Sequence, residues 1–185
     1  MNSTKAVLYA IFAGLMTLML SSQSFAATSV VSVKLWDAGP HSMDMLGKGA
    51  MRGMGMSGGM GTTGGTNMMG SKTGAASMGI DVAPRTIPAG EVTFEVTNAS
   101  KDMVHEMVIS PVRGENDPLP YDKSTMKVDE DAAGHLGEVS ELEPGKSGAL
   151  KLSLKPGKYI LYCNIPGHYA LGMWTLIKVE AKPAT

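Results

Sequence analysis

The sequence is poor in cysteine and histidine and has almost no net charge. It holds one cysteine and four histidines among 185 residues, and 16 basic against 17 acidic residues leave a formal charge of −1. A single cysteine excludes an internal disulfide. The balanced charge gives no reason to expect nucleic acid or a strongly charged membrane surface as a partner. Beyond the N-terminus no apolar run is long enough to cross a bilayer, so we expect no stable membrane insertion of the mature chain.

The N-terminus has the pattern of a secretory signal peptide. Lys5 supplies the positive start, an apolar stretch follows over residues 6–20, and Ser24 and Ala26 are the small residues that favour cleavage before Ala27. We therefore predict a signal peptide over residues 1–26 and an exported protein, most simply a periplasmic one. A lone thiol in an oxidising compartment needs a reason to be there, and metal ligation supplies one.

Donor side chains near the C-terminus are evenly spaced. Cys163, His168 and Met173 follow one another in five-residue steps. A thiolate and an imidazole bind copper strongly and a thioether binds it weakly, as in the His₂Cys sites with a long axial Met that transfer electrons. His105, in a separate apolar run over residues 104–109, supplies the missing histidine. The sequence thus predicts one copper ion held by these four residues.

Other chemistries fit this donor set less well. Structural zinc takes four Cys or His ligands and does not use a thioether. A Cys163 nucleophile paired with His168 needs a third, orienting group and a substrate cleft. A dinuclear copper site needs a second cysteine, and multicopper catalysis needs more histidines than His41 and His135 can add. We interpret His135 as a solvent-facing loop residue. With no obvious open position for a substrate, we expect no enzymatic activity.

The rest of the chain predicts a β-sandwich. Short runs with β-branched residues or period-two alternation, bounded by Pro-Gly and Pro-Ala-Gly turns, are typical of strands. We place them at residues 29–36, 91–97, 103–109, 148–154, 159–163 and 173–179. Such a pattern without a long helix favours an all-β antiparallel sandwich. The domain comprises a first strand within 27–38 and residues 80–185. The stretch 110–147 is an excursion of loops with a short helix near 129–136.

Between the first strand and the main domain the composition changes abruptly. Residues 39–79 consist mainly of Gly, Met, Ser and Thr and hold nine of the 16 methionines. Too few branched or aromatic side chains are present to offset the ordering entropy, so we predict a disordered insert. Its thioethers are soft ligands that suit Cu(I), beside His41, so the segment is a candidate for extra, weak Cu(I) binding. A flexible linker without metal function is the alternative.

The four donors and the run Tyr162-Cys163-Asn164-Ile165-Pro166-Gly167-His168 resemble the cupredoxins, the small blue-copper proteins, especially sulfocyanin and rusticyanin-like members. The resemblance covers roughly residues 80–180. It implies a Greek-key sandwich whose first histidine comes from an earlier strand and whose other three ligands come from one loop. It also implies that Asn98 ties the two ligand segments together by hydrogen bonds. The Met-rich insert is similar to segments of cupredoxins linked to copper tolerance.

Two functions follow from these observations. The first is a periplasmic protein that carries single electrons on a type 1 copper; the second is copper handling, in which the site binds or oxidises Cu(I) with help from the Met-rich segment. For a carrier we expect a monomer whose redox protein partners dock near His168. Ile165, Pro166, Ala170 and Leu171 then form an apolar docking patch around that histidine.

Overall fold

The computed structural model describes residues 28–39, 41–43, 77–112, 114 and 118–182. The predicted signal peptide and residues 44–76 of the predicted insert lie outside the described residues. Within the described part, no helix has the length and apolar character needed to cross a bilayer.

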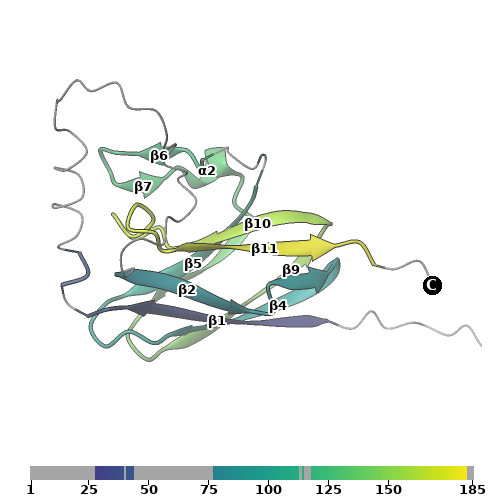
Figure 1. Ribbon diagram of the computed structural model, residues 1–185, viewed down its shortest axis with the longest axis horizontal. Helices are drawn as coiled ribbons and strands as arrows, with labels where there is room; N and C mark the ends of the chain where they lie inside the picture. The colour runs from purple at the N-terminus through teal and green to yellow at the C-terminus, as the bar shows by residue number, and fades with distance from the viewer. Residues whose placement is uncertain (1–27, 40, 44–76, 113, 115–117, 183–185) are drawn as a thin grey trace, which may run out of the picture.

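The described residues form two packed β-sheets (Figure 1). The first sheet has the strand order β2-β1-β4-β9, and the second has the order β3-β11-β10-β5-β8. The strands of the first sheet are β1 (Ser29–Asp37), β2 (Met78–Ala83), β4 (Gly90–Asn98) and β9 (Ser147–Leu154). Those of the second are β3 (Thr86–Pro88), β5 (His105–Pro111), β8 (Gly137–Leu142), β10 (Gly157–Tyr162) and β11 (Trp174–Glu180). The predicted β-sandwich is confirmed.

Two strand pairs differ from a purely antiparallel arrangement. β1 pairs with β4 in parallel, and β3 pairs with β11 in parallel, while the remaining neighbours in both sheets are antiparallel. A parallel pair needs a crossover connection rather than a hairpin, and local sequence patterns do not reveal that pairing. β2 begins at Met78, whose side chain is fully buried and whose register partner is Asp37. The last two residues of the predicted segment 39–79 therefore belong to a strand.

The alternating strands bury one face each. Val31, Val33 and Leu35 of β1 are buried, and so are alternate residues of β4 around the fully buried Phe94. These side chains meet those of the second sheet in one apolar cluster that also includes Cys163 and Met173. Two of the candidate ligands therefore belong to the main core, where packing restricts their movement.

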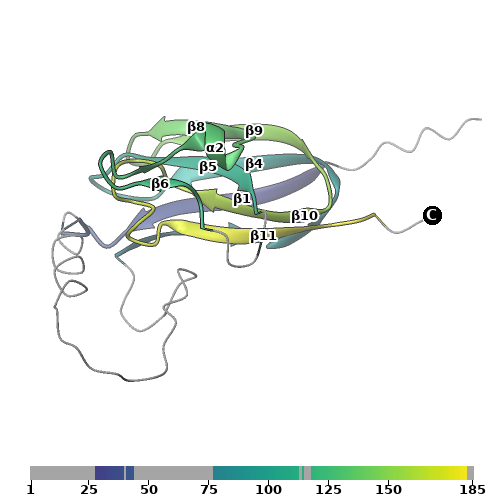
Figure 2. The ribbon, with the colours of Figure 1, turned by 90° about the horizontal axis from the view of Figure 1, so that it is seen from above.

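β5 and β10 are buried on both faces, because a third layer covers the second sheet. This layer consists of the hairpin β6 (Tyr121–Asp122) and β7 (Lys127–Val128) and the short helix α2 (Glu130–Ala133). Val128 and Ala133 pack on Val108, Ile160 and Tyr162. Figures 1 and 2 show the layer lying over β5 and β10. Within the stretch 110–147, β6, β7 and α2 thus form a covering layer, β8 belongs to the second sheet, and the predicted helix is present in shorter form.

Candidate metal centre

The loop from Cys163 to Met173 joins β10 to β11 and is closed on itself. The Cys163 N–H donates to Met173 O, and the Met173 N–H donates to His168 O, each at 3.0 Å. Gly167 and Gly172 have φ values of +87° and +91°, which glycine adopts without the penalty that a Cβ brings. Backbone bonds thus bring the thiol, the second imidazole and the buried methionine together.

His105 reaches the same place from the second sheet. It is the first residue of β5, and its side chain is fully buried. The pairing of β5 with β8 is irregular between His105 and Met107. A β-bulge re-aims the side chains around it, and here it lies at the residue that faces the Cys163 loop.

Donor atoms from three residues converge on one point. The sulfur of Cys163 lies 3.3 Å from Nδ1 of His168, and this nitrogen lies 3.2 Å from Nδ1 of His105. All three donor atoms lie within 4.8 Å of one another, and all three residues are buried. Met173, on the same loop as Cys163 and His168, is fully buried and belongs to the same apolar cluster as Cys163. A buried thiol with two imidazoles is the donor set that copper prefers.

The sequence matches a family model described as copper binding proteins, plastocyanin/azurin family, over residues 67–180. This match spans more than half of the chain. The protein is a member of this family. It is therefore a cupredoxin, and its donor set fits one type 1 copper ion.

Solved structures are similar to this cupredoxin at low sequence identity. Rusticyanin from Thiobacillus ferrooxidans is 18% identical, with 83% of this chain and 79% of that chain covered and a TM-score of 0.47. Reduced auracyanin from the photosynthetic bacterium Roseiflexus castenholzii is 17% identical, with 85% and 99% covered and a TM-score of 0.41. Auracyanin A from Chloroflexus aurantiacus is 18% identical, with 82% and 100% covered and a TM-score of 0.44. A comparison with curated protein sequences gives no significant match.

Burial sets the protonation states in the metal-free cupredoxin. It lowers the pKa of His168 to about 4, with repulsion from His105 adding to the effect. It also lowers the pKa of His105, although Asp37 opposes this shift. The same burial raises the pKa of the Cys163 thiol to about 12. Near neutral pH both imidazoles are therefore uncharged and ready to coordinate, whereas the thiol must release its proton to solvent when a metal binds.

Backbone amides also face the sulfur of this cupredoxin. The Glu106 N–H points at Cys163 Sγ at 3.5 Å, and the backbone of Ile165 contributes a second hydrogen bond. Hydrogen bonds to the sulfur favour the thiolate and tune the electronic properties of a bound metal.

Asp37 touches the far side of the first histidine. Its Oδ2 lies 3.1 Å from Nε2 of His105, and the side chain of Asp37 is 2% exposed. The other carboxylate oxygen accepts the Gly39 N–H at 2.6 Å. Ser42 stabilises this turn, because its hydroxyl accepts the Ala38 N–H and donates to Gly39 O. An acidic residue at a strand end carries no signal in the sequence that would assign it this contact.

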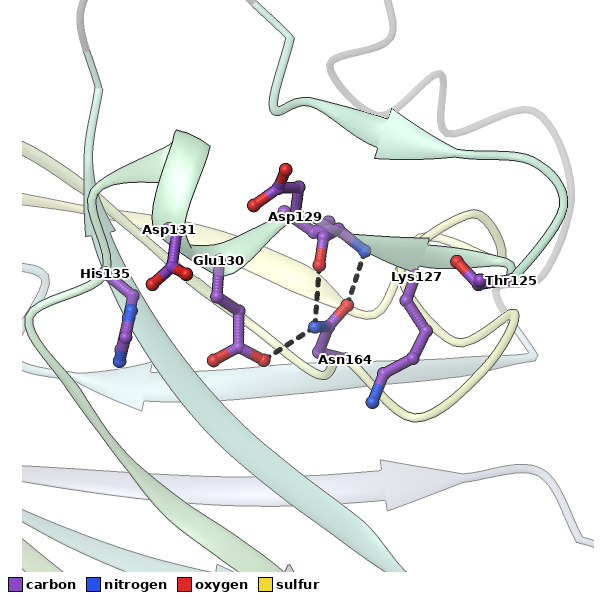
Figure 3. A pocket seen from close by; sticks show the side chains of 8 residues that line it. Thr125, Lys127, Asp129, Glu130, Asp131, His135 and Asn164 are labelled. Carbon is purple, nitrogen blue, oxygen red and sulfur yellow. Dashed lines mark hydrogen bonds between the residues drawn. The ribbon is translucent and has the colours of Figure 1, made fainter.

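Asn164 connects the ligand loop to the covering layer (Figure 3). Its side-chain oxygen accepts the Val128 N–H at 2.6 Å, and its amide donates to Val128 O and to Glu130. The Gly167 N–H also donates to Met126 O. Asn164, with side chains of β7 and α2, lines an open polar pocket that includes exposed His135. The layer thus stabilises the loop that carries three of the four predicted ligands.

The outcome for the remaining sequence predictions is mixed. Neither His41 nor His135 belongs to the group of converging donors in the described residues, and both are exposed. The resemblance predicts that Asn98 joins the two ligand segments. Its side-chain amide instead donates to Met103 O and Leu142 O, so it anchors the approach to His105 against β8. The reason is that β8 passes beside β5, a neighbour that the sequence pattern did not identify.

Proposed function

We propose that this cupredoxin is a periplasmic carrier of single electrons, with copper held by His105, Cys163, His168 and Met173. The convergence of Cys163 Sγ and two Nδ1 atoms in a buried cluster is the observation that supports this proposal most. When bound, copper supplies a one-electron Cu(II)/Cu(I) couple. The compartment follows from the signal-like pattern of residues 1–26.

The chain's own residues suit a carrier because they are held in place before any metal binds. Backbone hydrogen bonds fix Cys163 against Met173 and Met173 against His168. The donors are enclosed by the core, so both oxidation states meet the same ligands, and water has little access. A rigid, dry site needs little rearrangement when an electron enters or leaves.

The decisive experiment reconstitutes the mature protein with Cu(II) and examines it by absorption, electron paramagnetic resonance and voltammetry. We expect one copper per chain, a thiolate-to-copper absorption band and a reversible one-electron couple. A protein that binds copper without a thiolate signal, or that shows no reversible couple, contradicts the proposal.

The docking surface of the carrier is the ligand loop around His168. His168 is 3% exposed, whereas His105 is fully buried, so His168 provides the shorter path to the surface. Pro166 and Ala170 are exposed beside it, and Leu171 is partly buried. An apolar patch at a metal edge suits a transient protein partner.

Leu171→Glu tests this surface. A charge in an apolar contact must be desolvated on docking, so we expect electron transfer to a physiological partner to slow by about tenfold, corresponding to about 1.4 kcal/mol. The absorption spectrum should stay as in the wild type. The control is Lys151→Glu on β9, in the other sheet. Equal rates for the wild type and Leu171→Glu would contradict docking at the loop.

A second candidate function is copper handling, and one structural observation favours it. The Met-rich segment joins the sandwich between Met43 and Ser77, and the Ala38 N–H donates to Ser77 O at 2.8 Å. Asp37, which contacts His105, directly precedes Ala38. Both ends of the segment are therefore attached at the metal end of the sandwich, where Cu(I) held by thioethers could be passed to the site.

Removal of residues 44–76 separates the two functions, and it leaves the buried Met78 in place. In an anaerobic Cu(I) titration, we expect the full-length protein to bind extra copper that the shortened protein lacks, while both keep one tightly bound copper. Cys163→Ser in the full-length chain should lose the tight copper and keep the weak copper. If the shortened protein retains the full Cu(I) capacity, the Met-rich segment has no part in copper handling.

A further inference from the structure

Asp37 is a buried carboxylate whose contacts point to a role at the metal centre. It is the last residue of β1, in the sheet opposite the one that carries His105. Its Oδ2 lies 3.1 Å from His105 Nε2, and its side chain is 2% exposed. A buried carboxylate has a high desolvation cost unless hydrogen bonds or opposite charge offset it. Here the Gly39 N–H, the His105 imidazole and the Ser100 hydroxyl provide those partners.

The contact determines which nitrogen of His105 is available to a metal. A carboxylate only accepts hydrogen bonds, so the His105 Nε2 must carry the proton and donate it to Asp37. In a neutral imidazole the lone pair then resides on Nδ1, the nitrogen that faces Cys163 and His168. A second partner that fixes the tautomer also raises the basicity of the ligand.

The charge of Asp37 also distinguishes the two oxidation states. With the Cys163 thiolate and the Asp37 carboxylate, a centre containing Cu(II) has no net charge, whereas one containing Cu(I) has a charge of −1. Net charge is costly in a buried site. The carboxylate therefore favours the oxidised form.

We infer that Asp37 is a positioning residue of the copper site, which holds His105 in its Nδ1-ligating form and stabilises Cu(II) relative to Cu(I). This inference rests on the proposed copper ligation. It adds a determinant of the reduction potential that lies outside the four ligands.

Asp37→Asn tests the inference, since it removes the charge and keeps the size. Loss of such an outer partner costs roughly 10- to 100-fold in metal affinity. We expect this loss for Cu(II) and a much smaller one for Cu(I), measured with competing chelators. Because tenfold equals about 59 mV for one electron, the potential should rise by about 60 to 120 mV. In the metal-free variant, nitrogen NMR should show His105 losing its single Nε2–H tautomer.

Two further variants provide the controls. Asp81→Asn removes an exposed carboxylate of β2 that pairs with Lys34, so its potential should match the wild type. Asp37→Glu retains the charge, so its potential should lie closer to the wild type than that of Asp37→Asn does. An unchanged potential in folded Asp37→Asn, equal losses of both copper states, or equal shifts in Asp37→Asn and Asp37→Glu would each overturn the role of the charge. A wild-type protein without a thiolate-bound copper overturns the proposed function as well, which distinguishes the two failures.

Discussion

Cys163→Ser abolishes the thiolate absorption band and lowers Cu(II) affinity by more than the roughly 10- to 100-fold that loss of an outer partner costs. Cys163 supplies the strongest donor of the predicted set, and its sulfur lies 3.3 Å from His168 Nδ1. A serine hydroxyl remains protonated near neutral pH and is a poor copper ligand. The metal-free variant should stay folded, because the substitution removes little volume.

The pH dependence of copper binding by the wild type tests the protonation state of the site. Burial raises the pKa of Cys163 to about 12 and lowers that of His168 to about 4. Above about pH 7 the thiol carries a proton that copper must displace, whereas neither imidazole carries an extra proton, because burial lowers the pKa of both histidines. The apparent Cu(II) affinity should therefore rise about tenfold per pH unit between about pH 7 and pH 9, with about one proton released per copper.

Isothermal titration calorimetry in buffers with different ionisation enthalpies measures the released proton. His135→Ala serves as the control, since this exposed histidine lies outside the donor group. It should bind copper and release a proton as the wild type does. Tight Cu(II) binding by Cys163→Ser, or an affinity independent of pH in the wild type, would falsify the assigned role of the thiol.

Glu106→Gln increases the stability of the metal-free protein at alkaline pH. Burial raises the pKa of Glu106 to about 7, with repulsion from Glu138 adding to the effect. Its Oε1 is buried and has no hydrogen-bond partner. The raised pKa means that the folded state binds the proton more tightly than the unfolded state. Below about pH 4.5 Glu106 is protonated in both states, so it does not lower the free energy of unfolding. The free energy of unfolding then falls as the pH rises from about 4.5 through about 7.

The expected size follows from the shift of about 2.5 pH units, which corresponds to about 3 kcal/mol. Glu106→Gln should increase the free energy of unfolding by up to this amount at pH 8 and have little effect at pH 4. Urea unfolding of the metal-free protein at both values measures the difference. Glu95→Gln on β4 is the matched control, because Glu95 is exposed. Equal effects of Glu106→Gln at pH 4 and pH 8 would show that the carboxylate does not titrate in this range.

Local sequence patterns predicted most of the central strands. The predicted strand 91–97 corresponds to β4 and 148–154 to β9, because each alternates between a more exposed and a less exposed face. The structure also brings together the predicted donors His105, Cys163 and His168. Their spacing gave a strong signal because the turn at Pro166 and Gly167 confines the loop.

The parts that the sequence did not predict depend on contacts between distant segments. Asp37 and His105 are far apart in sequence and meet through packing of the two sheets. The hairpin of β6 and β7 has strands of two residues, too short to show a period. The position of this hairpin depends on Asn164, whose side-chain oxygen accepts the Val128 N–H in place of a backbone carbonyl. No local propensity encodes such a contact.

The hydrogen bond between Ala38 N and Ser77 O has a consequence for the evolution and engineering of this chain. It closes the end of the β1–β2 pair, so the register of these two strands is fixed on the sandwich side of the connection. Each doubling of the length of a flexible loop costs only about 0.6 kcal/mol in closure entropy. The connection between Met43 and Ser77 can therefore be lengthened at low entropic cost. A foreign peptide inserted here would be displayed beside a redox centre.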